Sequence, residues 1–481
     1  MKQKRILQRI ITFMLVCTFL LTATQPVLAS AASTTEKKAS VKFTKTKATG
    51  FTSISSLRST NQYLIAFGEK KSGNVLSYSS DGNTFKDIDL DKEIEKEYKG
   101  YSFSEIELNS HVSYIDGKKA YCVMGKATTN DKKDYHFLIN ISSDLKKVSI
   151  LKLDQAFEDL DKNAQNIEVE KYFDYDYKSG IIIANGSYED ASGTKTPVYL
   201  VIKKNSDLSA YKTPNVNCDR VDIVGKYLIC YNWDLRLTSD WSQATVGYFY
   251  YSKDYKTWKK GETPKDADAN SWNRSYYDWE SFCAAPQSSS DTYTLYYTSN
   301  MKDYKSISKD YVIQSNSRNM DFDKDDNKVY AIERSYGDKG QLVISVKSGA
   351  KWKQLFNYKA KTSDFNFREM RWIADGLVLV KDAKTKKLFQ YGAGKEYSTK
   401  LDVSKLNLSG TDSNNMCFGT YDSKYLLASK NGLAKYYLFE TPAKIKGIDN
   451  WSGKKTEERF YVYSDTAIYY VNKSAVTKAM K

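Results

Sequence analysis

The chain is poor in the residues on which most catalytic and metal-binding motifs depend. Among its 481 residues are only two histidines, His111 and His136, without the spacing of metal ligands, so histidine-based catalysis is not expected. No C-x-x-C pair occurs, which leaves a zinc site unsupported. A Gly-rich phosphate loop and a G-x-S-x-G nucleophile elbow are missing as well. The sequence therefore predicts neither a metal nor another cofactor.

One acidic run resembles the start of a calcium loop. Asp321, Asp323 and Asp325 follow the D-x-D-x-D pattern. Asp326, however, stands where such a loop needs glycine, and Ile332 where it needs a bidentate glutamate. We interpret this run as a hairpin turn between two strands.

Cysteine is also scarce, with six in the chain and one of them, Cys17, in the first apolar run. An odd, sparse count in the remainder argues against a disulfide framework. The segment CDRVDIVGKYLIC nevertheless places Cys218 and Cys230 on opposite arms of a hairpin that turns near Gly225. We predict a disulfide there; the alternative is that all the cysteines are buried thiols.

The N-terminus has the three parts of a secretory signal peptide. Four basic residues precede an apolar run over Ile10–Leu21, and small residues follow, with cleavage expected after Ala29 or Ala31. Cys17 follows valine, where a lipoprotein signal would need a small residue. No later stretch is long and apolar enough to span a bilayer. We therefore expect no transmembrane segment in a protein that is secreted, extracellular or associated with the cell envelope.

The chain is basic, with a formal net charge of +15, and its lysines are scattered. For an exported protein this charge favours an anionic cell-wall polymer or glycan over nucleic acid as a partner. The alternative is that the lysines serve solubility alone. Proline is rare, with six residues, so no Pro-rich linker is evident. We predict a signal peptide over 1–31, a flexible leader over 32–50 and one domain over 51–481, and we expect a monomer.

A short polar motif recurs along the chain. YSSDGNTF at Tyr78–Phe85 returns as YSKDYKTW at Tyr251–Trp258, and looser copies occur at Ile141–Val148, Lys204–Tyr211 and Tyr297–Tyr304. The copies align on Asp81, Asp144, Asp207, Asp254 and Asn300 at intervals of 63, 63, 47 and 46 residues. The aspartate and serine side chains can bond to nearby backbone groups and fix a tight turn. Repetition on this scale in a strand-rich chain indicates a propeller.

Apolar strands recur with the same spacing as the motif. Short runs rich in Val, Ile and Tyr, such as Ala120–Gly125 and Lys226–Tyr231, are bounded by Gly, Asp and Asn turns, which is typical of an all-β fold. Each unit accommodates four strands. We predict an all-β β-propeller of four-stranded blades, with eight blades favoured and seven as the alternative. Val41–Thr46 could complete the last blade, and two charged insertions, Lys92–Gly100 and Leu153–Asn166, predict short surface helices.

The motif resembles the Asp-box (BNR-like) family of sialidase-type β-propellers, whose usual pattern is Ser-x-Asp-x-Gly-x-Thr-Trp. Ser79–Phe85 and Ser252–Trp258 match it best, in a version one residue shorter. The resemblance implies the fold. It says little about chemistry, because Asp-boxes of the family lie on hairpins away from the ligand site.

The opening strand of each unit is expected to line the channel of a propeller, where ligands bind. Five of the nine arginines after the signal lie in these opening segments, and Glu105, Glu107 and Asp321 also occur there. The candidate anion-binding residues are Arg58, Arg220, Arg318, Arg368, Glu369 and Arg371, with Tyr277, Asp278 and Trp279 in the same kind of segment. The alternative is that Arg–Glu pairs tie neighbouring inner strands together.

Tryptophan is concentrated in two long polar segments. Trp233, Trp241, Trp272 and Trp279 lie there beside Asp and Asn, a combination that suits stacking on sugar rings. The alternative is that these rings pack the loops onto the sheets.

Three functions follow from these observations. The preferred one is a secreted, non-catalytic propeller that binds an anionic polymer or glycan at the channel mouth or on the Trp-rich loops. The second is a carbohydrate-active enzyme of sialidase-like architecture. In that family an arginine cluster, a Tyr–Glu pair and an Asp acid act together, which the resemblance would assign to arginines among those above and to Tyr277, Glu369 and Asp278. The family's Arg-Ile-Pro segment is replaced by SLRST around Arg58, which argues against catalysis. The third function is a scaffold for protein partners.

Overall fold

A computed structural model gives the fold of the protein. It describes residues 32–261 except 34, 111, 216–217, 219 and 238–242. From 262 to 415 it describes separate segments, mainly the strands given below, and it then describes 416–480 except 431–434 and 454–455. Side chains are described chiefly in 36–230, 249–261 and 416–480.

The described chain forms nine sheets, each built on four consecutive antiparallel strands or nearly so, and two of them gain a parallel strand from the N-terminus. The first sheet contains β4 (Phe51–Ser59), β5 (Leu64–Lys70), β6 (Gly73–Ser79) and β7 (Lys86–Asp89). The second contains β8 (Phe103–Leu108), β9 (Ser113–Ile115), β10 (Ala120–Thr129), β11 (Asp134–Ser142) and β12 (Val148–Lys152). The third contains β13 (Gln165–Tyr175), β14 (Ile182–Glu189), β15 (Lys195–Ile202) and β16 (Leu208–Lys212).

The next three sheets follow the same order. The fourth contains β17 (Val221–Val224), β18 (Tyr227–Leu237), β19 (Gln243–Ser252) and β20 (Lys259–Lys260). The fifth contains β21 (Trp272–Tyr277), β22 (Phe282–Pro286), β24 (Tyr296–Thr298) and β25 (Lys305–Ser306), beside a small pair of β23 (Thr292–Tyr293) and β26 (Ile313–Gln314). The sixth contains β27 (Arg318–Asp325), β28 (Lys328–Ser335), β29 (Gln341–Ser348) and β30 (Lys351–Lys359).

The last three sheets each take one strand from the N-terminus. The seventh contains β31 (Arg371–Ile373), β32 (Leu377–Leu379), β33 (Lys387–Gln390), β34 (Lys395–Ser398) and β1 (Ala32–Ser33). The eighth contains β35 (Leu406–Thr411), β36 (Cys417–Tyr421), β37 (Tyr425–Lys430), β38 (Lys435–Glu440) and β2 (Thr35–Ala39). The ninth contains β39 (Gly447–Trp451), β40 (Arg459–Tyr463), β41 (Ile468–Asn472) and β3 (Thr44–Lys45), followed by helix α4 (Lys473–Ala479).

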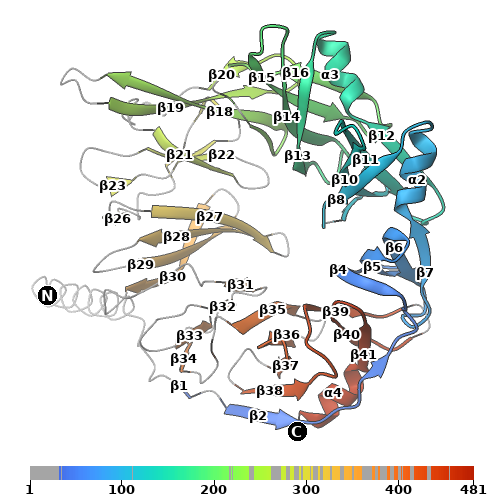
Figure 1. The fold of residues 1–481 in the computed structure, drawn as a ribbon. Helices are drawn as coiled ribbons and strands as arrows, with labels where there is room; N and C mark the ends of the chain where they lie inside the picture. Colours follow the sequence, from blue (N-terminus) through green and yellow to red (C-terminus); the bar gives the residue numbers. More distant parts are fainter. Residues whose placement is uncertain are drawn as a thin grey trace, which may run out of the picture.

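The sheets stand around a common centre, and the first strands β4, β8, β13, β35 and β39 lie on its inner side (Figure 1). The second strands are the most apolar, and apolar clusters fill the spaces between neighbouring sheets. The all-β fold of four-stranded sheets is therefore as predicted, and its arrangement is that of a β-propeller. The described sheets of four or five strands number nine, so the predicted count of eight blades is not confirmed.

The two ends of the ring meet in the ninth sheet. Strand β3 pairs antiparallel with β41, with Thr44 opposite Tyr470, as predicted for the segment Val41–Thr46. The first and ninth sheets also share one apolar cluster, which includes Ile54, Leu57 and Tyr461. The segment 32–50, for which the sequence predicts a flexible leader, thus supplies three short strands along sheets seven, eight and nine. They pair because the outer strands β34, β38 and β41 present free edges.

The repeated motif forms the turn that its residues predict. In the first copy Asp81 accepts hydrogen bonds from Ser79 Oγ at 2.8 Å and from the backbone N–H groups of Asn83 and Thr84, both at 2.7 Å. All three contacts recur at Asp254, and both backbone contacts recur at Asn300. Asp144 accepts from Ser142 Oγ and from the Lys146 N–H, while the Lys147 N–H donates to Ser142 Oγ. The residue after each has a positive φ, for example +70° at Gly82, which glycine adopts without strain.

The third copy lies two residues earlier than the sequence alignment predicts. Asn205, rather than Asp207, accepts the hydrogen bond from the backbone two residues on, at 3.3 Å. The positive φ, +70°, falls accordingly on Ser206. This turn is one residue shorter than the others, because Lys203 N–H bonds to the carbonyl of Asp207, whereas the Ser142 N–H bonds to that of Lys147.

Both charged insertions contain helices, as predicted. Helix α2 (Leu90–Glu97) is capped by Asp89, whose carboxylate accepts from the Lys92 N–H at 3.1 Å, and α3 (Asp154–Leu160) follows β12. The Asp321–Asp325 run, interpreted from the sequence as a hairpin turn, lies instead within strand β27, which pairs antiparallel with β28. None of the helices in the described part of the chain has the length and apolar character that crossing a bilayer needs.

The predicted disulfide is wrong. Cys218 and Cys230 are separate thiols, both fully buried in one apolar cluster. The register of the hairpin places Val221, not Cys218, opposite Cys230. The two cysteines therefore act as small apolar side chains in the core.

Polar side chains bond neighbouring inner strands to one another. Asp449 of β39 accepts hydrogen bonds from the Ser59 N–H and hydroxyl of β4, and Asp174 of β13 accepts from the Ile223 N–H of β17 at 2.6 Å. Burial raises the pKa of both carboxyls. Charged residues near the centre of the ring thus serve partly to hold sheets together.

Candidate functional site

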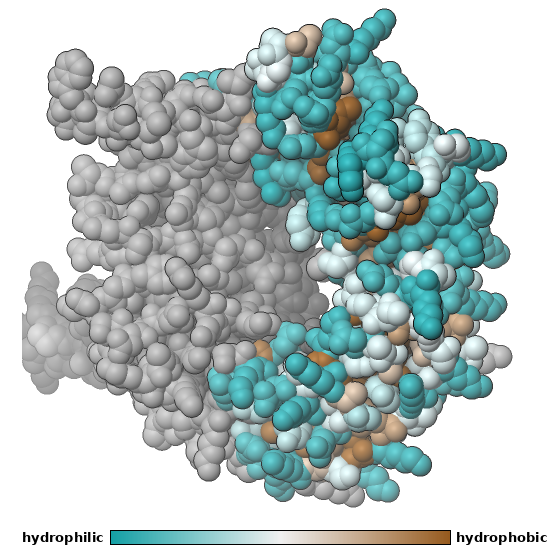
Figure 2. All heavy atoms as spheres, in the orientation of Figure 1, coloured by the Kyte–Doolittle hydropathy of each residue, from teal (hydrophilic) through white to brown (hydrophobic). Residues whose placement is uncertain are grey.

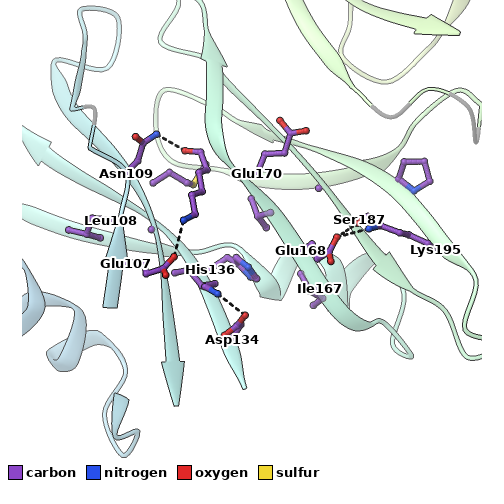
Figure 3. Close-up of a pocket in the computed structure, with 17 residues that line it drawn as sticks. Glu107, Leu108, Asn109, Asp134, His136, Ile167, Glu168, Glu170, Ser187 and Lys195 are labelled. Carbon is purple, nitrogen blue, oxygen red and sulfur yellow. Dashed lines mark hydrogen bonds and ion pairs between the residues drawn. The ribbon is translucent and has the colours of Figure 1, made fainter. Parts of the chain in front are cut away.

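A cleft of about 770 Å³ lies between the second and third sheets. Its walls come from β8, β10 and β11 on one side and from β13, β14 and β15 on the other (Figure 3). Such a volume falls in the usual range of ligand pockets. Figure 2 shows that the described surface on the side drawn is mostly hydrophilic, with small and separate apolar areas.

Three lysine–carboxylate pairs line the cleft. Lys171 of β13 reaches across to Glu107 of β8, with Nζ 3.0 Å from Oε2, and so joins the two walls. Within the second sheet, Lys126 Nζ lies 3.1 Å from Asp134 Oδ2. The third pair joins Lys195 of β15 to a carboxylate of β13, across the intervening strand β14, as described next.

Glu168 forms the third pair, with its Oε2 2.6 Å from Lys195 Nζ. The Ser187 hydroxyl donates to the same oxygen at 3.3 Å. Figure 3 shows these three side chains together on one wall, away from the Glu107 pair. Each pair presents ammonium donors beside carboxylate acceptors.

These pairs hold the carboxyl groups of the cleft in their ionised form. The Lys171 ammonium lowers the pKa of Glu107, and the Lys195 ammonium lowers the pKa of Glu168. Partial burial acts to raise the pKa of Asp134, but hydrogen bonds from Thr128 and Lys126 outweigh it, so this pKa is lowered too. A glycosidase needs a carboxyl group with a raised pKa as its general acid. None of these three has that property.

His136 lies among these pairs on β11 and is almost fully buried. Its backbone N–H and its ring Nδ1 both face Asp154, the first residue of α3, at 2.6 and 2.8 Å. A carboxylate on Nδ1 favours the tautomer with hydrogen on Nδ1, which leaves Nε2 as an acceptor. Asp154 therefore fixes the orientation of the one histidine in the cleft.

A bulge in β13 shapes the wall that carries Lys171. Val169 pairs with Gly186 and Phe173 with Ala184, so residues 170–172 stand opposite a single residue of β14. Such bulges re-aim side chains. Gly186 permits the close approach, since a Cβ at this position would lie 2.4 Å from the Glu168 carbonyl oxygen.

Of the predicted ligand residues, Arg58 and Arg220 have described side chains. Arg58 is exposed on β4. Arg220 is exposed too, but its Nε lies 2.8 Å from Asp222 Oδ1 and a terminal nitrogen lies 3.9 Å from Glu170 of the third sheet. Arg220 thus pairs with a carboxylate of the neighbouring sheet, as the alternative interpretation expects, and its part in ligand binding stays a prediction. Neither residue lines the cleft.

The other predicted residues remain predictions. The backbone of five of them is described in strands: Trp233 in β18, Trp272 and Tyr277 in β21, Arg318 in β27 and Arg371 in β31. The side chains of these five lie outside the described residues, as do Trp241, Asp278, Trp279, Arg368 and Glu369 altogether.

Sequence reasoning named one charged residue of the cleft, Glu107, and missed the others. Glu107 was a candidate because it lies in an opening strand. His136 was set aside for want of metal-ligand spacing, and Lys126, Lys171 and Glu168 carried no motif. One signal was present: Asp134 and His136 alternate on β11, and Lys126 lies directly opposite His136 on β10, so all three share a face.

No family model matches the chain, and no curated protein matches it. Solved structures do resemble it. The β-propeller domain of a protease from Pyrococcus furiosus, described as having an open velcro topology, is 10% identical over 87% of this chain and 97% of that chain, with a TM-score of 0.34. A Trypanosoma rangeli sialidase in complex with sialic acid is 9% identical over 93% and 91%, with a TM-score of 0.27. An Aleuria aurantia lectin mutant is 7% identical over 77% and 96%, with a TM-score of 0.25. By its sheets and their arrangement, this chain has a β-propeller architecture.

Proposed function

We propose that this protein is a secreted, non-catalytic β-propeller that binds a neutral glycan in the cleft between its second and third sheets. The observation that carries the proposal is the set of three lysine–carboxylate pairs on the walls of the cleft. A sugar hydroxyl both donates and accepts hydrogen bonds. A vicinal pair of hydroxyls can therefore donate to a carboxylate and accept from the ammonium beside it.

The charge of the cleft favours a neutral ligand over the anionic polymer that the composition suggests. Four carboxylates (Glu107, Asp134, Glu168 and Glu170) accompany three lysines on its walls. Arg220, 3.9 Å from Glu170, balances the fourth carboxylate, so a polyanion would meet a site without net positive charge and gain no attraction there. The net positive charge of the whole chain would then serve solubility or the attraction of the protein to an anionic envelope.

The lowered pKa values of Glu107, Asp134 and Glu168 support binding without hydrolysis. A carboxyl group that stays ionised accepts hydrogen bonds from hydroxyls but has no proton to give to a leaving group. Secretion rests on the signal-like segment at the N-terminus.

The test is binding of the protein to two sets of immobilised carbohydrates at low and at raised salt. The neutral set comprises cellotetraose, maltotetraose, mannotetraose and chitotetraose, and the anionic set comprises polygalacturonate and heparin. We expect binding to a neutral tetrasaccharide that survives raised salt, with no release of shorter sugars. Binding to the polyanions alone, lost as salt rises, would contradict the neutral-glycan proposal. Hydrolysis would contradict the non-catalytic one.

A matched pair of variants places the binding in the cleft. Lys171→Met removes the ammonium that joins the two walls and should weaken binding by roughly ten-fold or more, since a hydrogen bond to a charged group contributes about 1.5–3 kcal/mol. Lys146→Met is the control. Its side chain is similarly exposed, at 80% against 69%, and its ion pair with Asp144 lies in a repeat turn outside the cleft. Equal effects of the two variants would remove the cleft from the proposal.

A further inference from the structure

An aromatic platform (Tyr98, Tyr101, Phe103 and Tyr135) lies at the start of the second sheet. Tyr101 is 50% exposed, one of three large apolar or aromatic side chains that are exposed in the described part of the chain; the others are Tyr172 and Tyr177. Of these three, Tyr101 is the one with described ring contacts to other aromatics. An exposed aromatic supported by a cluster of rings marks an interaction site better than an isolated one.

The platform holds the Tyr101 ring in a fixed orientation. Its ring is parallel to Phe103, at 6.4 Å and 7° between planes, and meets Tyr135 edge-on at 4.8 Å. Tyr98, almost fully buried at the end of α2, supports all three, with ring centroids 5.6 Å from those of Phe103 and Tyr135. Aromatic contacts of this geometry stabilise the cluster, so little side-chain entropy remains to be lost on binding.

Ammonium groups border the rings. Lys133 Nζ lies 5.0 Å from the centroid of Tyr135, and Lys152 Nζ lies 4.8 Å from that of Tyr98. Lys152 is also held by Glu97, 3.3 Å away. An open aromatic face beside hydrogen-bond donors fits a pyranose, which offers C–H groups on one face and hydroxyls at its edge.

The platform and the cleft lie on opposite faces of the same end of the second sheet. Asp134, which lines the cleft, and Tyr135, which belongs to the platform, are successive residues of β11 and so point to opposite faces. The turn between β10 and β11, with Lys133 in it, separates them. A ligand that occupies both the cleft and the platform must therefore pass around this turn.

We propose that the platform is a second sugar-binding subsite, which takes one ring of a neutral oligosaccharide whose other units lie in the cleft. This rests on the proposed function and narrows it, because the ligand is then an oligosaccharide of several units rather than a mono- or disaccharide. Tyr101 stacks on the outer sugar ring and sets the preference for chain length.

The experiment compares a disaccharide with a hexasaccharide of whichever neutral sugar named above binds tightest. Binding is measured by calorimetry for the unchanged protein and for Tyr101→Ala, Tyr101→Phe and Tyr177→Ala. Tyr177 is the control, since it is 48% exposed and its ring has no described aromatic contact. We expect Tyr101→Ala to weaken hexasaccharide binding about three- to ten-fold, the scale of an aromatic contact, and to leave disaccharide binding unchanged. Tyr101→Phe keeps the ring and should bind like the unchanged protein.

The outcomes separate the two proposals. Lys171→Met should weaken both ligands, whereas Tyr101→Ala should weaken only the longer one. If Tyr101→Ala binds the hexasaccharide as tightly as Tyr177→Ala does, or loses both ligands alike, the subsite is refuted and the cleft stands. If the unchanged protein binds none of the neutral sugars, the proposed function fails and the subsite fails with it. Equal Tm values of the variants show that the fold is not the cause.

Discussion

The junction between the first and ninth sheets offers the sharpest test of how the ring is held together. Asp449 of β39 lies at this junction, and its carboxylate accepts three hydrogen bonds. Two come from the Ser59 backbone N–H and hydroxyl on β4, the latter at 3.1 Å, and one comes from the Asn450 N–H at 2.8 Å. The residues that pair come from positions 390 apart in the chain.

Replacing Asp449 by alanine leaves two backbone N–H groups and a hydroxyl of Ser59 and Asn450 without their acceptor. Bonds to a charged acceptor contribute about 1.5–3 kcal/mol each, and an orphaned buried donor costs about 1–3 kcal/mol. Part of this is recovered, because the variant no longer buries a carboxylate whose pKa burial has raised. We expect a net loss of about 3–4 kcal/mol in the free energy of unfolding, a large share of the total for most proteins.

The assay is urea unfolding followed by tryptophan fluorescence, with Asp465→Ala as the control. Asp465 lies on the same sheet, is 69% exposed and pairs with Lys446, so its loss should cost at most about 1 kcal/mol. If Asp449→Ala does not fold, Asp449→Asn is measured in its place. It keeps the size of the side chain but places a donor where the Ser59 N–H needs an acceptor, and it should lose about 2 kcal/mol. Equal midpoints for Asp449→Ala and Asp465→Ala would refute the view that this carboxylate secures the junction.

Three further predictions concern the turns, the cleft wall and the core. Hydrogen bonds from the Thr84 and Asn83 N–H groups outweigh partial burial and lower the pKa of Asp81 to about 2, below its ordinary value near 4. Its stabilising effect is therefore complete above pH 4 and lost as the pH falls toward 2, so the unchanged protein should lose its advantage over Asp81→Ala across that window in acid unfolding. Gly186→Ala should lower stability by about 1–3 kcal/mol and weaken glycan binding, because its methyl group would lie 2.4 Å from a backbone oxygen of β13; a variant with an unchanged Tm would show that the strands can separate freely. The unchanged protein should be no more sensitive to reductant than Cys218→Ala, and a mass of the unchanged protein two daltons lower without reductant than with it would show that a disulfide forms after all.

The sequence predicts those parts of the fold that depend on local chemistry. The Ser-x-Asp turns form around Asp81, Asp144 and Asp254 because a short carboxylate can reach the N–H group two residues on, wherever the chain lies. The helix at Leu90 forms for a similar reason, with Asp89 as its cap. Local contacts of this kind need no knowledge of the rest of the fold.

The third turn and the cysteine pair show where such reasoning fails. KNSDLSAY contains an Asp in the aligned position, but a turn one residue shorter gives its role to Asn205. The hairpin arms were correctly placed around Gly225, yet the register that separates Cys218 from Cys230 depends on how β17 pairs with β18. A pattern in the sequence does not fix the register of a turn or strand to within a few residues. The register nevertheless decides which residues are in contact.

The cleft was hidden from the sequence for a further reason: its walls belong to two different repeats. The link between Glu107 and Lys171 spans 64 residues, and Lys171 lies in the bulge at 170–172, which breaks the alternation of β13. When the repeats of a sequence are compared unit by unit, an irregularity in a single unit is overlooked. Bulges of this kind are nevertheless common at functional sites. If the bulge positions the ligand-binding lysine, then removing two of its three residues should restore regular pairing and abolish glycan binding while the ring still folds. The same two-residue deletion in the regular strand β15 should damage folding instead, since it would remove buried residues from the core.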